Sequence, residues 1–276
     1  MKLIESKVEV IEQQPGLEGV YKQIELAGRT CYKSEDKITK DSAKEFVDRM
    51  IKSKHGAMLE HGTVYLAIPM TTYAPDAVNT YRDNAYSKVN DCNEFIFTDK
   101  YGDNVAAWCV TTNLRVLVEN NCLEDLEFLC EPTEHHEKRI TARFTCDRGV
   151  SHEIVRHRVM SFAQESQRYV GYDKDKFGNE VVFVKPHWYT DEFPACITWT
   201  ESLKIAEEKY MELREAGLTP QDARGVLPNA TKTEIVVTGF ESDWTHFFEL
   251  RTAGSAHPDM RKLAIELQEK LNSVNE

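Results

Sequence analysis

The stretch KRITARFTCDRGVSHEIVRHRVMSFAQESQRYV, residues 138–170, decides the fold class because three different patterns follow one another within it. Its first part alternates apolar and polar positions, which predicts a strand with one buried face. The apolar positions are Ile140, Ala142, Phe144 and Cys146. Next, GVSHEIVRHR (149–158) spaces its apolar residues three and four apart and predicts a short helix. After Met160 this period fails, and the dense polar side chains predict a loop.

Around this stretch, helical and strand patterns occur without a regular alternation of the two. The predicted helices are 41–56, with a Ser42-x-x-Glu45 capping box, 104–120, 191–217, a segment opened by Thr219 and Pro220, and the C-terminus. The predicted strands are 62–70, 138–146, 180–186 and 231–240. Long helices with few strands favour an α+β fold over a doubly wound sheet. Since no linker or repeat divides residues 1–276, we expect a single domain.

Composition restricts the classes of partner. The chain carries 34 Lys and Arg against 46 Asp and Glu, a formal charge of -12, which repels nucleic acid and acidic membrane surfaces. Neither a secretory signal nor a run of about 20 apolar residues is present, so we expect a cytoplasmic protein outside the membrane. Seven scattered cysteines without a Cys-x-x-Cys pair favour reduced thiols, and no metal site is expected.

The polar segment after the short helix concentrates cations. Arg156, Arg158 and Arg168 stand among serines and glutamines with little acid nearby to neutralise them. Guanidinium, hydroxyl and carboxamide groups together suit a planar, multiply hydrogen-bonded anion, most commonly phosphate. The alternative is a solvated basic surface. Two further cations, Arg224 in a short capped segment and Arg251 on a helix with aromatic residues, strengthen the prediction of an anion site.

Several segments resemble the flavin-dependent thymidylate synthases. RHRVMSFAQESQRY (156–169) is similar to the family signature Arg-His-Arg, then a serine, then Ser-x-Arg-Tyr. HGAMLEH (55–61), PQDARGVLP (220–228) and the pair HFFELR and AHPDMRKLA (246–264) resemble its other blocks, in the same order. The resemblance runs from about residue 25 to 265. Residues 70–140 match weakly and are interpreted as a partly lineage-specific elaboration.

The resemblance implies reductive methylation of dUMP to dTMP, with methylenetetrahydrofolate, NADPH and FAD. It also implies a twisted, mainly antiparallel sheet packed with long helices, and a homotetramer whose active sites are shared between chains. Arg251 would be catalytic, because a fixed cation stabilises negative charge developing on the uracil ring. The dUMP-binding residues would be Glu153, Arg156, Gln164, Glu165, Ser166, Gln167, Arg168, Arg224 and Arg251. The FAD-binding residues would be His55, Glu60, Arg156, His157, Arg158, Gln164 and His246.

The chain departs from the family pattern at some of these positions. Ala57 replaces a frequent Ser or Thr, Gln164 a frequent Glu, and residues 240–242 the family's Asn-x-Arg, which changes the expected flavin pyrophosphate and adenine contacts. His257 and Pro258 stand where Ala-Gln is common. No cysteine has the proline and histidine neighbours that the classical thymidylate synthase nucleophile needs, which favours the flavin route.

Two other functions compete with this interpretation. A histidine phosphatase would begin with Arg-His-Gly, but Arg158 occupies the glycine position where the phosphate must approach. A non-catalytic nucleotide- or RNA-binding module would explain the basic loop. The charge of -12 and the absence of a broad basic and aromatic strip argue against that module.

Overall fold

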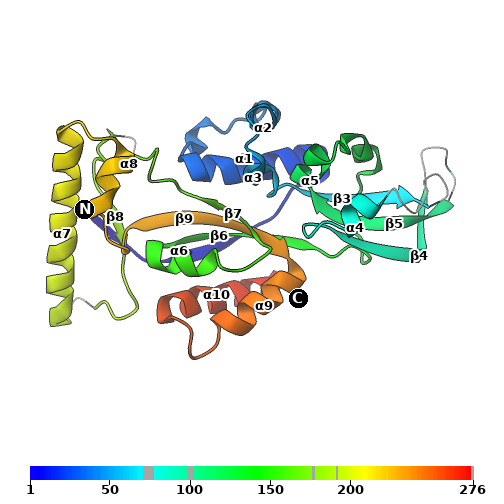
Figure 1. The fold of residues 1–276 in the computed structure, drawn as a ribbon. Helices are drawn as coiled ribbons and strands as arrows, with labels where there is room; N and C mark the ends of the chain where they lie inside the picture. Colours follow the sequence, from blue (N-terminus) through cyan, green and yellow to red (C-terminus); the bar gives the residue numbers. More distant parts are fainter. Residues whose placement is uncertain (71–77, 99–101, 103, 176–177, 191, 275–276) are drawn as a thin grey trace.

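The computed structural model describes residues 1–70, 78–98, 102, 104–175, 178–190 and 192–274, with the backbone alone for 91–98 and 274. Its centre is a four-stranded antiparallel sheet in the order β2-β6-β9-β7. The strands are β2 (Lys7–Ile11), β6 (Arg139–Asp147), β7 (Ser161–Gln164) and β9 (Lys232–Phe240). The β6–β9 ladder pairs all nine residues of each strand. The other elements lie on the faces of this sheet or at the two ends of the molecule (Figure 1).

Each face of the central sheet carries its own layer of helices (Figure 1). One layer contains α6 (Arg148–Ile154), α9 (Glu241–Arg251) and α10 (Pro258–Val274). The other contains α1 (Gly16–Tyr32), the turn η1 (Glu35–Lys37), α2 (Ser42–Lys52) and α3 (Gly56–Leu59). The alternation along the strands divides the core between the layers. Phe144 packs with α9 and α10, whereas Val236 packs with α1 and α2.

A second antiparallel sheet, in the order β3-β5-β4, forms one end of the molecule (Figure 1). Its strands are β3 (Thr63–Pro69), β4 (Lys88–Thr98) and β5 (Asn104–Asn113). The neighbouring elements are α4 (Asn79–Arg82), α5 (Leu114–Glu119) and η3 (Leu123–Phe128). Val64, Leu66 and Val110 share one hydrophobic cluster with α1. The sheet therefore extends the core beneath α1 rather than standing apart from it.

The opposite end holds the longest helix (Figure 1). Strands β1 (Lys2–Ile4) and β8 (Val182–Val184) pair in parallel there. The helical elements are α7 (Pro194–Glu215), α8 (Pro220–Ala223) and η5 (Arg224–Val226). Phe183 and Tyr210 belong to a third hydrophobic cluster that joins α7 to the strand pair. This cluster fixes α8, and with it Arg224, beside the sheet.

The α+β class with mainly antiparallel sheets is confirmed. The predicted strands at 62–70, 138–146, 180–186 and 231–240 are present, as are the predicted helices at 41–56 and 191–217 and the helical C-terminus. Gly217 ends α7 with φ +89°, a conformation that favours glycine. Thr219 caps α8 by accepting a hydrogen bond from the Asp222 amide. The predicted capping box of α2 is wrong, because the Ser42 hydroxyl bonds to Glu25 instead.

The predicted helix at 104–120 is wrong over most of its length. Residues Asn104–Asn113 form β5, and only Leu114–Glu119 are helical. β5 is the middle strand of its sheet, and its last seven residues are all buried. A strand buried on both faces has a continuous apolar run, which has no strand period to distinguish it from a helix. Asn113 ends the strand and caps α5 through its side chain.

Two predictions inside the opening stretch also need correction. The short helix ends at Ile154, so Arg156 and Arg158 lie in the turns that follow it and not on the helix. Residues Ser161–Gln164 form the edge strand β7 rather than a loop. Their partner is β9, about 70 residues further along the chain, so no local pattern records the pairing. The helix α1, which has 17 residues, was not predicted at all.

No helix in the described part of the chain is long and apolar enough to cross a membrane. The six cysteines whose side chains are described carry thiols rather than disulfides. Burial raises the pKa of the Cys31 thiol to about 11. This thiol is therefore a poor nucleophile near neutral pH. The single-domain prediction for residues 1–276 and the interpretation of 70–140 as an elaboration remain predictions.

The contact between α1 and α2 offers a test of the core. A Cβ atom added at Gly28 would lie 2.4 Å from the Phe46 ring. We expect Gly28→Ala to reduce the free energy of unfolding by about 1–3 kcal/mol, because the buried Phe46 ring must shift to make space for the methyl group. Gly254→Ala, whose Cβ meets nothing within 4 Å, is the control. Urea unfolding of both variants measures the difference, and equal stabilities would contradict this packing.

Candidate functional site

Arg251, at the end of α9, is the centre of a hydrogen-bonded cluster on the α6 side of the sheet. Its Nε donates to His157 Nε2 over 2.8 Å, and its Nη2 donates to the Glu153 carbonyl oxygen over 3.0 Å. Its Nη1 donates to the Glu153 carboxylate. The guanidinium is thereby fixed by three acceptors, and the carboxylate partly neutralises it. The structure thus brings Arg251 to Glu153 and His157, two predicted site residues that lie almost 100 positions earlier in the sequence.

His157 accepts a hydrogen bond in this cluster and must therefore be unprotonated at Nε2. Its ring packs edge-on against Phe247, with ring centroids 4.9 Å apart. Burial, then the charge of Arg251 and then His246 lower the pKa of His157 to about 4. Near neutral pH the imidazole is consequently uncharged. It can orient Arg251 without repelling it.

Exposed cations surround this cluster. Arg156 and Arg158 extend from the turns after α6 into solvent, and the described residues give neither side chain a hydrogen bond or ion pair. His246 lies 6.4 Å from His157 between ring centroids and is exposed. Two guanidinium groups without an acidic partner leave this surface able to bind an anion.

The predicted phosphate loop, Ser166–Arg168, lies on the other side of the sheet, beside the end of α1. The Ser166 amide donates to the Cys31 carbonyl oxygen over 3.0 Å, which fixes the start of the loop. Arg168 is exposed, and its Nε donates to Gln221 Oε1 of α8 over 2.8 Å. This bond brings the loop next to α8, which Arg224 follows directly. Gln167 lies within the same loop and is half-buried.

The pleat of β7 separates two adjacent predicted residues. Gln164 points toward α6 and donates to Ser151 Oγ over 2.8 Å. Glu165 follows on the opposite side, where its buried carboxylate pairs with Lys232 Nζ at 2.8 Å. Neither side chain is free in this structure. Both anchor the segment that leads into the phosphate loop.

Two predicted flavin-binding residues, His55 and Glu60, flank α3 on the α1 side. His55 Nδ1 bonds with the Tyr32 hydroxyl at 2.8 Å, and the Tyr32 ring lies 5.8 Å from Tyr169 between centroids. His55 is thus close to the phosphate loop. Glu60 is buried and accepts a hydrogen bond from Arg115.

The predicted site residues therefore form two groups separated by the central sheet. The helix-side group consists of Glu153, His157, His246 and Arg251 with the neighbouring Arg156, Arg158 and Gln164. The loop-side group consists of His55, Ser166 and Arg168 with Glu60, Glu165, Gln167 and Arg224. No hydrogen bond or ion pair within the described part of the chain joins a member of one group to a member of the other.

Sequence reasoning missed several residues that hold the loop-side group. Lys232 bridges the buried carboxylate of Glu165 and that of Glu234, and Lys33 pairs with Glu234 at 2.8 Å. Arg148 donates a long hydrogen bond of 3.4 Å to the Glu165 carbonyl oxygen. Charged residues at inward positions of a strand are the signal that could have identified Lys232 and Glu234, because such positions are normally apolar.

The donor set on the helix side suits part of a flavin dinucleotide. The exposed guanidinium groups of Arg156 and Arg158 fit a pyrophosphate, and the uncharged imidazole of His157 fits a neutral aromatic ring. Two predicted flavin-contacting positions offer fewer hydrogen bonds to the cofactor. Ala57 has no hydroxyl, and the Glu60 carboxylate is already bound by Arg115. No group of three or more His, Cys, Asp or Glu side chains in the described residues could hold a metal ion.

In the comparison with protein families, the model described as thymidylate synthase complementing protein matches residues 130–275. This range contains the whole opening stretch, residues 138–170, and every later element of the described chain through α10. The whole three-stranded sheet, strands β1 and β2, and helices α1 to α5 lie outside it.

Curated relatives with the name flavin-dependent thymidylate synthase match a similar share of the chain. The protein from Geobacter sulfurreducens is 34% identical over 135 residues, which cover 46% of this chain and 53% of the relative. The protein from Mycobacterium bovis is 39% identical over 141 residues, or 46% and 54%. The chain spans about half the length of the curated relatives it matches.

Among solved structures, a crystal structure of the UMP/dUMP methylase PolB from Streptomyces cacaoi bound with 5-Br dUMP aligns with the chain. The alignment covers 99% of this chain and 93% of that chain at 17% identity, with a TM-score of 0.45.

The environment of His157 generates a prediction about pH. The pKa is lower in the folded state, about 4, than the usual 6.5 of an unfolded chain. As the pH falls from 6.5 toward 4, the unfolded state therefore binds a proton that the folded state excludes, and this contribution destabilises the protein. We expect an NMR titration to give a His157 midpoint below pH 5.

Arg251→Gln provides the matched control for this titration. It removes one cause of the shift, so the His157 midpoint should move upward. A midpoint near 6.5 in the unaltered protein would show that His157 is solvated and does not accept a hydrogen bond from Arg251.

Proposed function

Because the chain belongs to the thymidylate synthase complementing protein family, we propose that it converts dUMP to dTMP by reductive methylation. Methylenetetrahydrofolate would donate the methylene group, NADPH the reducing equivalents, and FAD would carry the electrons. The observation that supports this proposal most strongly is that the family match includes the entire segment Arg156–Val170 and the α9 residue Arg251. These residues supply the cations that a nucleotide and a flavin dinucleotide both need.

We assign the dUMP phosphate to the loop-side group. Arg168 presents its guanidinium to solvent, Ser166 adds a hydroxyl, and Arg224 follows the helix that Arg168 contacts. Three donors of this kind suit the three terminal oxygens of a phosphate monoester. The Glu165–Lys232 ion pair lies beneath the loop and fixes its start, so less conformational entropy is lost when the phosphate binds.

We assign the uracil ring to Arg251. Its position is fixed before the substrate binds, because His157 and Glu153 hold three of its nitrogen atoms. A cation fixed in this way stabilises negative charge that develops on the ring and needs no reorganisation during the reaction. The Glu153 carboxylate reduces the net charge of the unliganded site. Arg251 therefore attracts a neutral pyrimidine weakly and a developing anion strongly.

FAD, when bound, would supply the electron transfer that side chains cannot perform. Arg156 and Arg158 would hold its pyrophosphate, and His157 and His246 would lie beside it on the helix side. His55 would contribute from the loop side, where the Tyr32 hydroxyl orients its ring. Glu60 and Gln164 would support these side chains through their own partners, Arg115 and Ser151.

The separation of the two groups supports a shared site. In one chain the sheet lies between Arg251 and Arg168, whereas a nucleotide must reach both. A second copy can supply the missing half, so we propose a homotetramer in which the helix-side group of one chain faces the loop-side group of another. We place this assembly in the cytoplasm, where reduced thiols persist.

Release of tritium from 5-tritiated dUMP tests the reaction directly. With methylenetetrahydrofolate, FAD and NADPH present, we expect release by the unaltered protein and a loss on the order of 100- to 1,000-fold in Arg251→Ala. The affinity for dUMP should fall much less, because the phosphate stays bound. Arg49→Ala, on the exposed side of α2, is the control and should retain full activity. A protein that binds dUMP without releasing tritium would instead be a non-catalytic binding module.

Subunit mixing tests the shared site. Arg168→Ala and Arg251→Ala should each be inactive alone, and their hybrids should regain part of the activity, since some sites then combine an intact loop-side group with an intact helix-side group. Mass analysis establishes that hybrids have formed. If hybrids form and activity stays absent, both arginines serve the site from the same chain.

A further inference from the structure

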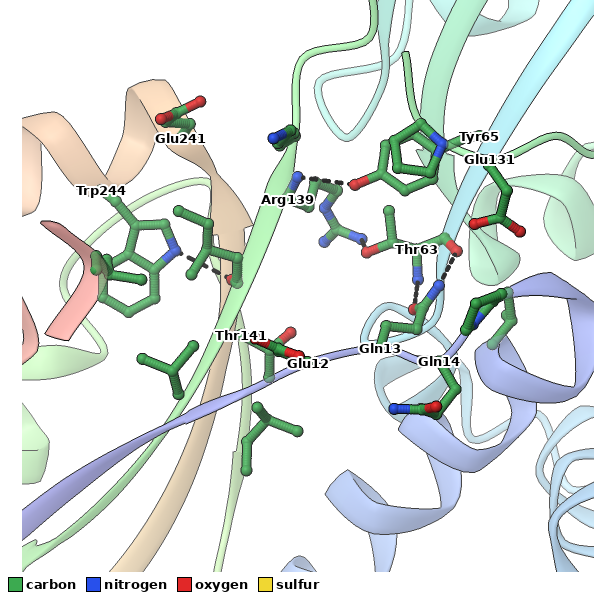
Figure 2. A pocket seen from close by; sticks show the side chains of 18 of the residues that line it. Glu12, Gln13, Gln14, Thr63, Tyr65, Glu131, Arg139, Thr141, Glu241 and Trp244 are labelled. Carbon is green, nitrogen blue, oxygen red and sulfur yellow. Dashed lines mark hydrogen bonds between the residues drawn. The ribbon is translucent and has the colours of Figure 1, made fainter. Parts of the chain in front are cut away.

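A cavity of about 850 Å³ lies between the start of α1, strands β2, β3 and β6, and helices α9 and α10. Figure 2 shows Arg139 at its centre, with Gln13 and Thr63 on one side and Trp244 on the other. All the predicted site residues are described, and none of them is among the residues that line this cavity. The hollow is therefore lined by other residues than the two groups of the candidate active site, although Arg139 bonds to the backbone of Glu60 in the loop-side group.

Arg139 contributes a cation without an acidic partner to this cavity. Its guanidinium donates to neutral acceptors, namely the Glu60 carbonyl oxygen at 3.0 Å, Thr63 Oγ1 at 3.4 Å and Ser161 Oγ at 3.5 Å. Its Nε is buried and has no hydrogen-bond partner among the described residues. The nearby Glu60 carboxylate is occupied by Arg115. Nε itself lies out of a ligand's reach, but a buried, incompletely paired charge is costly, so an anionic acceptor at the part of the guanidinium that lines the cavity would reduce this cost.

Burial lowers the pKa of the Arg139 guanidinium. Desolvation lowers the pKa of Arg139 to about 10, despite opposing contributions from Tyr65 and from the carboxylates of Glu60 and Asp243. The Phe240 ring, with its centroid 5.6 Å from the guanidinium carbon, partly compensates through a cation–π contact. Arg139 remains charged near neutral pH, so an anionic acceptor binds it more strongly than a neutral one does.

Aromatic and aliphatic side chains form much of the remaining wall. Tyr65 accepts a hydrogen bond from the Arg139 backbone amide and lies beside the guanidinium in Figure 2. Phe248 and Trp244 of α9 line another side, and the indole is fixed by its bond to the Ile140 carbonyl oxygen at 3.1 Å. A ligand that fills this volume therefore needs a planar or apolar body.

The mouth of the cavity is acidic, which limits the charge of the ligand. Four exposed carboxylates, Glu12, Glu131, Glu241 and Glu249, line it together with one lysine, Lys138. Nucleotides and other polyphosphates would be repelled there. A single carboxylate that reaches Arg139 meets a guanidinium that forms no ion pair with a carboxylate of the described chain, and it carries only one negative charge past the mouth.

From these features we infer that the cavity is a second ligand site, which binds an aromatic monocarboxylate with its carboxylate on Arg139. The ring packs against Tyr65 and Phe248, and the acidic mouth selects against dianions. The site is independent of the proposed reaction, because its walls exclude the residues assigned to dUMP and FAD.

Calorimetric titration with 1-naphthoate, in the absence of dUMP, folate and FAD, tests the site. We expect 1-naphthoate to bind the unaltered protein, and Arg139→Gln to weaken binding at least about tenfold, since a charge-assisted hydrogen bond is lost. The neutral 1-naphthalenemethanol and the dianionic 1-naphthyl phosphate should both bind more weakly than 1-naphthoate. The double substitution Glu131→Gln and Glu241→Gln should improve binding of the phosphate selectively.

Two further variants keep the test decisive. Thr245→Trp places a large side chain in the cavity from an exposed position of α9 and should abolish binding even if Arg139→Gln fails to fold. Arg251→Ala, in the candidate active site, should leave 1-naphthoate binding unchanged.

Three results would overturn the inference. The first is no binding of 1-naphthoate at millimolar concentration, which would show that the cavity holds only water or is filled by a neighbouring copy of the chain. The second is equal binding of 1-naphthoate and 1-naphthalenemethanol. The third is unchanged binding in Thr245→Trp. Because no substrate or flavin is present, failure of this test is distinct from failure of the proposed reaction.

Discussion

The antiparallel ladder between β6 and β9 is the constraint on which the rest of the structure depends. It joins residues about 100 positions apart and places one helical layer on each side of a single sheet. The strand period of two then decides which layer each side chain meets. Phe144 packs beneath α9, Glu234 pairs with Lys33 next to α1, and Arg139, the first residue of β6, reaches the cavity. The two halves of the candidate site and the cavity thus follow from one pairing.

Electrostatic pairing separates the arginines of this chain by role. Arg251 is held by the Glu153 carboxylate and the neutral His157 imidazole. These bonds fix the direction of the guanidinium, and the carboxylate neutralises part of its charge. Arg156, Arg158 and Arg168 keep their charge exposed to solvent and suit mobile anionic groups. Arg139 is enclosed with neutral acceptors only. In a protein with a net charge of -12, such local differences decide where an anion binds, because the overall field opposes it everywhere.

The three-stranded sheet contributes to the cavity beside the central sheet as well as forming one end of the molecule. Thr63 and Tyr65 of β3 supply part of the cavity wall, and Thr63 also bonds to Gln13 before α1. The family match begins only at residue 130, so this wall comes from a part of the chain outside the match. A cavity whose wall lies partly outside the family match can bind a ligand of its own without any change in the residues assigned to the proposed reaction.

The sequence by itself determined the α+β class, the strand at 138–146, the capped helix opened by Thr219 and the identity of the cationic segment, because these depend on local periodicity, local capping and residue type. Only the tertiary structure decided that Asn104–Asn113 is a strand, since burial on both faces removes the period that would identify it. It alone revealed β7, whose partner is distant in sequence, and with β7 the placement of Gln164 and Glu165 on opposite sides of the sheet. The pairing of Arg251 with Glu153 and His157, and the enclosure of Arg139, likewise depend on contacts between remote elements that no local pattern encodes.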